Sequence, residues 1–398
     1  MSKKSIYAQL EAVAVPSRNL KPSPRHWNPG LLRYRDKLWL AYRYHRRETS
    51  DARCGIAITE LDSKTFEPIG QSSRLAFAGP TNTEHHEDCR LFLFRGEPYI
   101  SFTEMNGYIP GHDYTCVMKY AKLKLTGVRW SVEDEWQPVY GNNAGYAKEK
   151  NWIFFEHAND LYCIYSGAPR HVVLKLDGEK VVDEFSTDGP EWHWGHFRGG
   201  TPPVDLGDGR MMAIFHSSLP TEIAPHYVRY YAGAYTFESK PPFRPLQISE
   251  MPIMCGSEED GHKVDPRYVQ GWKPFVVFPC GLISDGPDWL CALGVNDWQC
   301  AVARIKPDHL KLGAADGSDF TPRFYRAANG TIPVKYMGAN QKPEFLHWTI
   351  VKRRGACGVG HGVMKVHQAR AASEVLEHPG VEEITEEEFK KSMVPVRL

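Results

Sequence analysis

A β-hairpin pattern returns five times along this chain. Each copy has an apolar run, a turn built on Gly, Asp or Asn, and a second run rich in apolar and aromatic residues. The copies are Tyr34–Arg43, Phe94–Glu104, His157–Ser166, Leu206–Ser217 and Ser284–Gly294. Alternating apolar residues around such turns are typical of antiparallel hairpins, and a period of about 60 residues is on the scale of a propeller blade. The sequence therefore predicts an all-β fold, a five-bladed β-propeller.

The repeats also predict where the strands lie. We expect the inner strands to begin near Trp27, Cys89, Lys150, Arg198 and Phe275. We expect outer strands over Gly55–Leu61, Tyr114–Leu125, Val172–Phe185, Tyr227–Phe237 and Gln299–Ile305. Because a propeller is a closed ring, residues at the inner ends of distant repeats converge on one central pocket. Polar residues far apart in the sequence can therefore form one site.

The two ends of the chain differ from the repeats. The segment that begins at Met364, MKVHQARAASEVLEH, has helical spacing. Further on, Thr385 and Glu388 form a capping-box signal for a second short helix. We therefore predict three parts: an irregular lead-in over residues 1–24, the propeller over residues 25–362, and a short helical tail over residues 363–398.

The composition indicates which classes of partner and which cellular compartment to expect. Acidic and basic residues balance at 48 each, whereas a nucleic-acid footprint needs a basic surplus. No stretch approaches the roughly 20 apolar residues of a membrane span, and the first residues lack the apolar core of a signal peptide. The nine cysteines are scattered with no CxxC pair, which is typical of reduced thiols. We predict a cytoplasmic protein with no nucleic-acid or membrane partner.

The histidines give little support for a metal centre. The HExxH motif is absent, and the spacings of the clustered histidines match no familiar ligand set. The histidines concerned are His85, His86, His193, His196 and His216. We expect neither a metal nor a cofactor.

Polar or charged residues stand at the same end of the inner strands in every repeat. They are Asn28 and Arg43, then Glu87, Asp88 and Arg90, then Lys150 and Asn151, then Arg198 and His216, and finally Asn296 and Asp297. Each set alone has a structural explanation, such as a turn asparagine or an acid paired with an arginine. Buried charges need partners, and five such sets at one rim favour a functional site. Two adjacent acids beside an arginine leave one carboxyl paired and the other able to hold a proton, as a general acid requires.

At these residues the chain resembles glycoside hydrolase family 130, whose members are five-bladed propellers that act on β-mannosides, many of them as phosphorylases. The resemblance runs from about Trp27 to about Arg304. It rests on the order of several short segments: WNPG, EDCR in place of the family's Glu-Asp-Pro-Arg, KNW, GGTPP, a strand ending in His, YYAGAY, and FPCGL followed by LGVND.

The resemblance implies roles for individual residues. Asp88 matches the family's catalytic acid, which donates a proton toward the glycosidic oxygen directly or through a sugar hydroxyl. Asn28, Arg43 and Asp297 match residues that hold the sugar, and we place Glu87 and Arg90 with them as substrate-binding residues. Phosphate would be the co-substrate of a phosphorylase. The positions that match the family's phosphate site are Lys150, Asn151, His216 and Tyr231.

Two departures from the family pattern weaken the expectation of phosphate binding. The phosphorylases carry a basic residue at the end of the third returning strand, where this chain has Tyr165 and Ser166. Lys150 stands where an Arg is usual, so bidentate recognition is lost there. Arg198 and Arg170 are the candidates to replace the missing cation. Cys89 replaces the signature proline, which changes backbone rigidity and not the chemistry.

We therefore predict a carbohydrate-active enzyme that cleaves or transfers a β-mannoside-type bond by inverting single displacement. The nucleophile is phosphate in a phosphorylase and water in a hydrolase, which needs a second carboxylate. The candidates for that base are Glu156, Glu191 and Glu222. A related mannosyltransferase and a non-catalytic glycan-binding propeller remain alternatives, because propellers host unrelated functions. An oligosaccharide or glycoside is the expected partner, and the oligomeric state is open.

Overall fold

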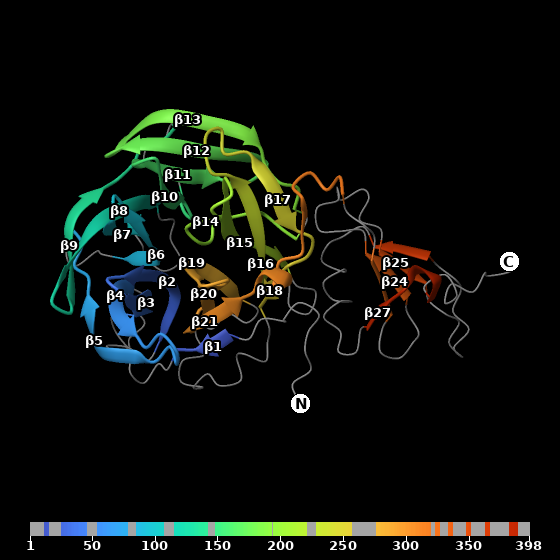
Figure 1. Ribbon diagram of the computed structural model, residues 1–398, viewed down its shortest axis with the longest axis horizontal. Coiled ribbons are helices and arrows are strands. Elements are labelled where there is room, and N and C mark those ends of the chain that lie inside the picture. Colours follow the sequence, from blue (N-terminus) through green and yellow to red (C-terminus); the bar gives the residue numbers. More distant parts are fainter. Residues whose placement is uncertain are drawn as a thin grey trace.

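Five antiparallel sheets stand around a common centre like the blades of a propeller (Figure 1). The computed structural model describes residues 12–15, 25–45, 54–78, 85–106, 115–141, 148–192, 194–220, 228–256, 276–319, 323–326, 333–336, 348–351, 363–366 and 382–388. In blades 1 to 3, consecutive strands pair from the centre outward, whereas the outermost strands of blades 4 and 5 are β22 (Leu312–Ala314) and β1 (Ala12–Ala14), which come from elsewhere in the chain. The predicted fold class and number of blades are confirmed.

The strands of the blades follow the order of the sequence. Blade 1 contains β2 (His26–Tyr34), β3 (Lys37–His45), β4 (Cys54–Leu61) and β5 (Pro68–Arg74), and blade 2 contains β6 (His86–Phe94), β7 (Glu97–Asn106), β8 (Thr115–Thr126) and β9 (Arg129–Trp136). Blade 3 contains β10 (Ile153–His157), β11 (Asp160–Ser166), β12 (Arg170–Asp177) and β13 (Lys180–Asp188). Blade 4 contains β14 (Val204–Asp205), β15 (Arg210–Pro220), β16 (Val228–Glu238), β17 (Pro245–Ser249) and β22 (Leu312–Ala314), with β18 (Met254–Cys255) paired to β16. Blade 5 contains β19 (Val277–Asp285), β20 (Asp288–Val295), β21 (Gln299–Ile305) and β1 (Ala12–Ala14), and a short 3-10 helix, Pro307–His309, precedes β22.

The inner hairpins of blades 1, 2 and 3 turn in the same way. Each has a two-residue loop with positive φ at both positions: Arg35–Asp36, Arg95–Gly96 and Ala158–Asn159. Turns of this kind match the right-handed twist of the strands that they join. The hairpin pattern in the sequence is therefore explained by one repeated turn geometry.

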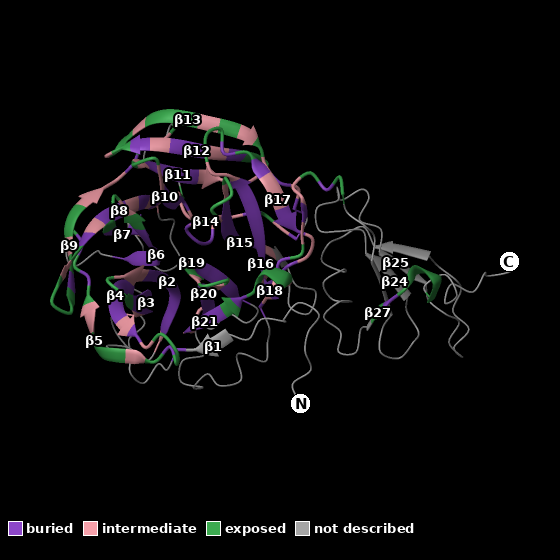
Figure 2. Cartoon of the chain, in the orientation of Figure 1, coloured by how far each residue is buried: buried purple, intermediate pink, exposed green. Residues whose placement is uncertain are grey.

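Both faces of the sheets are buried where the blades meet. Five apolar clusters fill the five junctions between neighbouring blades, and Figure 2 shows burial falling from the inner strands toward the outer ones. Adjacent side chains divide between two junctions: Phe154 packs between blades 2 and 3, and Phe155 packs between blades 3 and 4. This pattern explains why the inner strands read as nearly continuous apolar runs.

The inner strands approach one another closely at the centre of the ring. A Cβ atom on Gly30 of blade 1 would lie 2.9 Å from the backbone nitrogen of Leu91 in blade 2. Backbone atoms cannot move aside as a flexible side chain could, so glycine is required here. The close approach places the polar residues next to Gly30 directly beside those of blade 2.

The ends of the chain differ in part from the prediction. The lead-in supplies β1, which pairs with β21 as the outermost strand of blade 5. Val363–Val366, expected to open a helix, instead forms β26 and pairs with β25 (Trp348–Val351), because two β-branched valines suit a strand. The rest of that expected helix lies outside the described residues. A short helix at residues 386–388 confirms the second helical signal, and Thr385 caps it through Glu388.

The strands after β22 belong to separate small sheets. In one of them, β23 (Arg323–Arg326) pairs with both β24 (Pro333–Tyr336) and β27 (Glu382–Ile384). The strands that Figure 1 labels β24, β25 and β27 are drawn beside the ring and join none of its blades. Among the described residues, no helix has the length and apolar character to cross a membrane.

Candidate active site

Asn28 and Asp88 occupy equivalent positions in neighbouring blades. In β2 the register with β3 shifts between Trp27 and Gly30, and in β6 the register with β7 shifts in the same way between Glu87 and Arg90. Each shift is a β-bulge, which re-aims a side chain. Both bulge residues are left-handed, with φ of 51° at Asn28 and 54° at Asp88. Asn and Asp tolerate this conformation better than most residues do, which explains the residue types at these two positions.

The Asp88 carboxyl is anchored through one oxygen only. Its Oδ1 accepts a 2.7 Å hydrogen bond from Nδ2 of Asn28 and lies 3.5 Å from Nη1 of Arg43. Its Oδ2 accepts no hydrogen bond from any residue that the structure describes. Gly294 of blade 5 makes this arrangement possible, because a Cβ there would lie 2.1 Å from Oδ1 of Asn28. The result is a held carboxyl with one oxygen left for a proton or a substrate.

Glu87 has the opposite environment, with three basic side chains around it. It pairs with Nη2 of Arg43, accepts a 2.8 Å hydrogen bond from Nζ of Lys150, and lies 2.8 Å from Nε2 of His85. Burial alone would raise the pKa of Glu87, but Arg43, His85 and Lys150 together hold that pKa well below its ordinary value. Burial also lowers the pKa of His85, so this ring is neutral and donates its Nε2 proton to the carboxylate.

Glu87 and the two cations Lys150 and Arg43 therefore hold each other in their charged forms. Burial opposes the charge of Lys150, but Glu87 and Asp88 outweigh it and raise the pKa of the ammonium. The pKa of Arg43 is raised in the same way, against burial, by Cys54, Glu87 and Asp88. The two adjacent acids thus differ: Glu87 is paired, and Oδ2 of Asp88 accepts no hydrogen bond from the described residues. The partners of Glu87 are Arg43 and Lys150, and not the neighbouring Arg90 that the sequence suggested.

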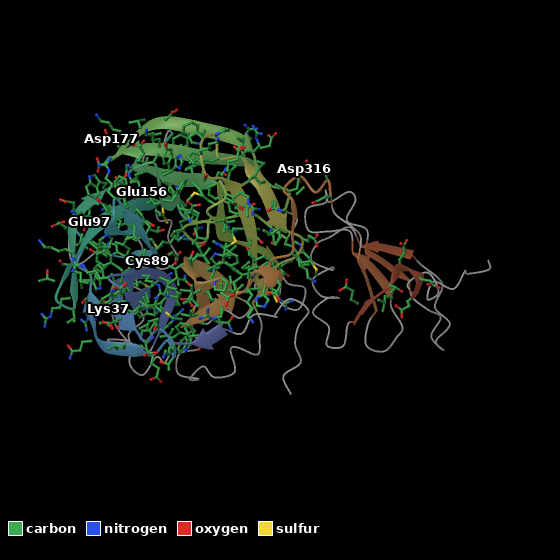
Figure 3. The ribbon with its side chains drawn as sticks, viewed as in Figure 1. Lys37, Cys89, Glu97, Glu156, Asp177 and Asp316 are labelled. Carbon is green, nitrogen blue, oxygen red and sulfur yellow. The ribbon has the colours of Figure 1, made fainter. Side chains whose placement is uncertain are left out.

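Arg90 lies beneath the two acids and is completely buried. Its guanidinium donates to the carbonyl of Asp88 at 2.8 Å and to Oδ1 of Asn151 at 3.1 Å. It also donates to the carbonyls of Gly200 at 2.5 Å and Gly199 at 3.3 Å. Figure 3 labels Cys89, which lies between Asp88 and Arg90 in the chain, inside the ring of blades.

Blades 1 and 5 complete the rim through Arg25, which the sequence analysis did not single out. Its Nε donates to the carbonyl of Asp297 at 2.9 Å, and its Nη1 lies 2.8 Å from Nε2 of His45. Burial and the charges of Arg25 and Arg43 lower the pKa of His45 to about 3. The ring of Trp27 has the guanidinium carbons of Arg25 and Arg43 at 4.5 Å and 4.6 Å from its centroid. These contacts bring Asp297 to the same rim as Arg43.

The sequence carries a signal for the pairing of Asn28 with Asp88. WNPG and EDCR have an amide or acid at the same second position, exactly the two residues that occupy equivalent bulges, 60 positions apart. An alignment of the repeats on that position adds the direct Asn28–Asp88 contact to the prediction that both residues lie at one pocket. No comparable signal marked Arg25 or His45.

Only two of the four residues expected at the phosphate site lie together. Lys150 and Asn151 touch Glu87 and Arg90, but His216 and Tyr231 project from opposite faces of blade 4, because His216 pairs with Ala232 and Ser217 with Tyr231. The His216 ring packs 4.3 Å from that of Phe278 in blade 5, and burial together with Arg198 and Arg90 holds its pKa well below the ordinary value. Tyr231 packs against Trp194 on the other face.

Two of the three carboxylates considered as a base, Glu156 and Glu191, lie in segments away from Asp88. Glu156 is at the far end of β10 from Asn151, about 16 Å along the strand at 3.3 Å per residue, and accepts the backbone N–H of Arg95. The backbone of Glu191 is bonded to Ala315, just past the outermost strand of blade 4. Glu222 lies outside the described residues. In the part of the chain that the structure describes, no group of three or more His, Cys, Asp or Glu side chains is placed to hold a metal ion.

The Glu87 cluster predicts an acid-dependent stability. Glu87→Gln should lower the free energy of unfolding at pH 7 by about 3–5 kcal/mol, because it leaves buried cations unpaired. The folded pKa of Glu87 is depressed, so its contribution is complete above the unfolded pKa of about 4.3 and is lost as pH falls toward the folded value. The gap between wild type and variant, measured by urea unfolding, should stay constant from about pH 7 to 5 and shrink below. The exposed Glu97→Gln is the control, and a gap that does not change with pH would contradict this assignment.

Comparisons with known proteins find this fold among solved structures. No family model and no curated protein matches the sequence. A glycosyl hydrolase from Bacteroides ovatus is 13% identical, with a TM-score of 0.53 over 78% of this chain and 92% of that chain. The β-1,2-mannobiose phosphorylase from Listeria innocua is 14% identical, with a TM-score of 0.50 over 77% and 93%.

A third similar structure is from the GH130 family of mannoside phosphorylases. That family contains glycoside hydrolases that target β-1,2 mannosidic linkages in Candida mannan. This structure is 13% identical, with a TM-score of 0.51 over 76% of this chain and 93% of that chain. At such identities the likeness concerns the fold. This chain has the five-bladed propeller fold of glycoside hydrolase family 130.

Proposed function

We propose that the protein is a glycosidase-type enzyme that cleaves a β-mannoside-type bond, with Asp88 as its general acid. The observation that carries the proposal is that the two adjacent acids, Glu87 and Asp88, have different environments. Glu87 is paired with the cations Arg43 and Lys150 and accepts from the neutral His85, whereas Asp88 is held by one oxygen and its Oδ2 accepts no hydrogen bond from the described residues. A general acid needs a fixed position and a free oxygen that can carry the proton.

The mechanism follows from this geometry as a single displacement. Asp88 gives its proton to the glycosidic oxygen, directly or through a sugar hydroxyl, as the bond from that oxygen to the anomeric carbon breaks. The nucleophile forms its bond to the same carbon from the opposite face, so the configuration inverts; a phosphate nucleophile needs no protein base, whereas water must give its proton to a second carboxylate. Asn28, Arg43 and Asp297 hold the sugar, and the Trp27 ring supports Arg43 from behind. Two fold relatives, the β-1,2-mannobiose phosphorylase from Listeria innocua and the structure from the GH130 family, concern β-1,2-mannosides and support mannose as the first sugar to try.

The charge pattern weakens phosphate binding, but water would need a base that neither Glu156 nor Glu191 supplies beside Asp88, so hydrolysis and phosphorolysis rank level. Lys150 is 2.8 Å from Glu87, so part of its charge is already satisfied. Ser166 brings no charge, and its hydroxyl faces the carbonyl of Ala168. Arg170 pairs with Asp188 on the outer strands of blade 3, away from the centre. Arg198, joined to His216 by a backbone bridge, is another cation among the described residues of blade 4.

Asp88→Asn should remove turnover while sparing sugar binding, because the amide keeps the size and hydrogen bonding of the carboxyl but has no proton to transfer. The loss of kcat on an unactivated β-mannobioside should be about 10²–10⁴-fold. Titration calorimetry with the disaccharide should give a dissociation constant close to that of the wild type. Wild-type turnover in the variant would remove Asp88 from the mechanism.

Inorganic phosphate should change the rate of turnover little. Loss of one charge-assisted contact, worth about 1.5–3 kcal/mol, weakens phosphate by roughly ten- to a hundred-fold. The measurement is release of mannose and of mannose 1-phosphate from β-mannobiosides at increasing phosphate. Saturation at sub-millimolar phosphate would show instead a phosphorylase, and loss of that saturation in Arg198→Gln would then identify the cation that replaces the missing one. No turnover under either condition would favour a glycan-binding propeller.

A further inference from the structure

Arg90 is a buried cation whose partners are all neutral oxygens. Its side chain is completely buried, and it forms no ion pair with any residue that the structure describes. Its positive charge is met by the carbonyls of Asp88, Gly199 and Gly200 and by the side-chain oxygen of Asn151. A buried charge is costly unless hydrogen bonds satisfy it in full, so this arrangement depends on every one of these contacts.

The acceptors come from three different blades. The carbonyl of Asp88 belongs to blade 2, Asn151 leads into blade 3, and Gly199–Gly200 open blade 4. The ring of Phe278 in blade 5 lies 5.9 Å from the guanidinium carbon. A single side chain therefore sets the position of the Asp88 backbone relative to the next two blades of the rim.

The same contacts hold two residues in an unfavourable backbone conformation. Asp88 and Asn151 are both left-handed, with φ of 54° and 64°. Such residues cost free energy and persist only where the surroundings over-determine them. Arg90 bonds to the backbone of Asp88 and to the side chain of Asn151. Because Oδ1 of Asn151 accepts from Arg90, the Asn151 amide presents its nitrogen, the donor, to whatever binds at the rim.

We propose that Arg90 is a positioning residue, which fixes the direction of Asp88 and the orientation of the Asn151 amide and does not itself touch the sugar. This inference rests on the proposed role of Asp88 as the acid. Lysine cannot replace the arginine, because one ammonium lacks the planar fork that serves acceptors from three blades at once. Loss of the fork should therefore impair proton donation more than sugar binding.

The test compares two substrates whose need for an acid differs. A β-mannobioside needs a proton on its leaving oxygen. The nitrophenolate of a nitrophenyl β-mannoside, by contrast, leaves as a stable anion without a proton. Without added phosphate, Arg90→Lys should lower kcat on the disaccharide by about 10²-fold, but on the nitrophenyl substrate by less than about tenfold. KM should change by less than about threefold for both. The control is Arg95→Lys, since Arg95 also bonds a carbonyl of the next blade, that of Asn159, from the far end of the same hairpin.

The outcomes separate this inference from the proposed function. Equal losses of kcat on the two substrates, or a profile like that of Arg95→Lys, would overturn the role of Arg90. If Asp88→Asn itself keeps full activity, the proposed function fails instead. Asp88→Asn combined with Arg90→Lys should be little worse than Asp88→Asn alone, because both changes act on one group.

A second variant keeps the test decisive if Arg90→Lys does not fold. Asn151→Ala removes one acceptor of the Arg90 fork at a half-buried position. Assayed without phosphate, it should show a smaller loss with the same preference for the nitrophenyl substrate. An equal loss on both substrates would contradict the positioning role.

Discussion

The inner strands of this propeller meet backbone to backbone at the centre of the ring, and the site depends on that contact. Gly30 lets blade 1 lie against the backbone of blade 2, and Gly294 in blade 5 leaves room for the side chain of Asn28. Only at this spacing can the amide of Asn28 reach Oδ1 of Asp88 at 2.7 Å. Two bulges then turn these side chains out of the strand pattern. The geometry of the candidate site is thus a consequence of how tightly the ring closes.

Charge at the centre is balanced across blades. Glu87 draws Arg43 from blade 1 and Lys150 from blade 3, while Arg90 draws carbonyls from blades 2 and 4. Each of these groups would be costly to bury alone, and each is satisfied by a neighbouring blade. The same pairing that stabilises the ring leaves Asp88 with one oxygen that bonds to none of the described residues, which links the stability of the fold to the proposed chemistry.

The repeat pattern predicted the fold well, because hairpin turns and alternating apolar residues are local signals. It also predicted that Asn28, Arg43 and Asp88 meet, since a ring brings equivalent strand ends together. It did not predict that Arg90 is sealed beneath the site or that His216 and Tyr231 face apart, because burial and register arise from packing between blades. The Val363–Val366 helix failed for a related reason: pairing with β25 overrides local helical spacing.

The most direct measurement of this account is a crystal structure of Asp88→Asn with a β-mannobioside bound. The account predicts the sugar at the centre of the ring between Asn28, Arg43 and Asp297, with the glycosidic oxygen or an adjoining hydroxyl within about 2.6–3.2 Å of the residue 88 side chain. A sugar bound elsewhere, for instance in the cleft that Arg170, Arg244 and Asp316 line at the outer edge of blades 3 and 4, with the centre of the ring unoccupied, would contradict it.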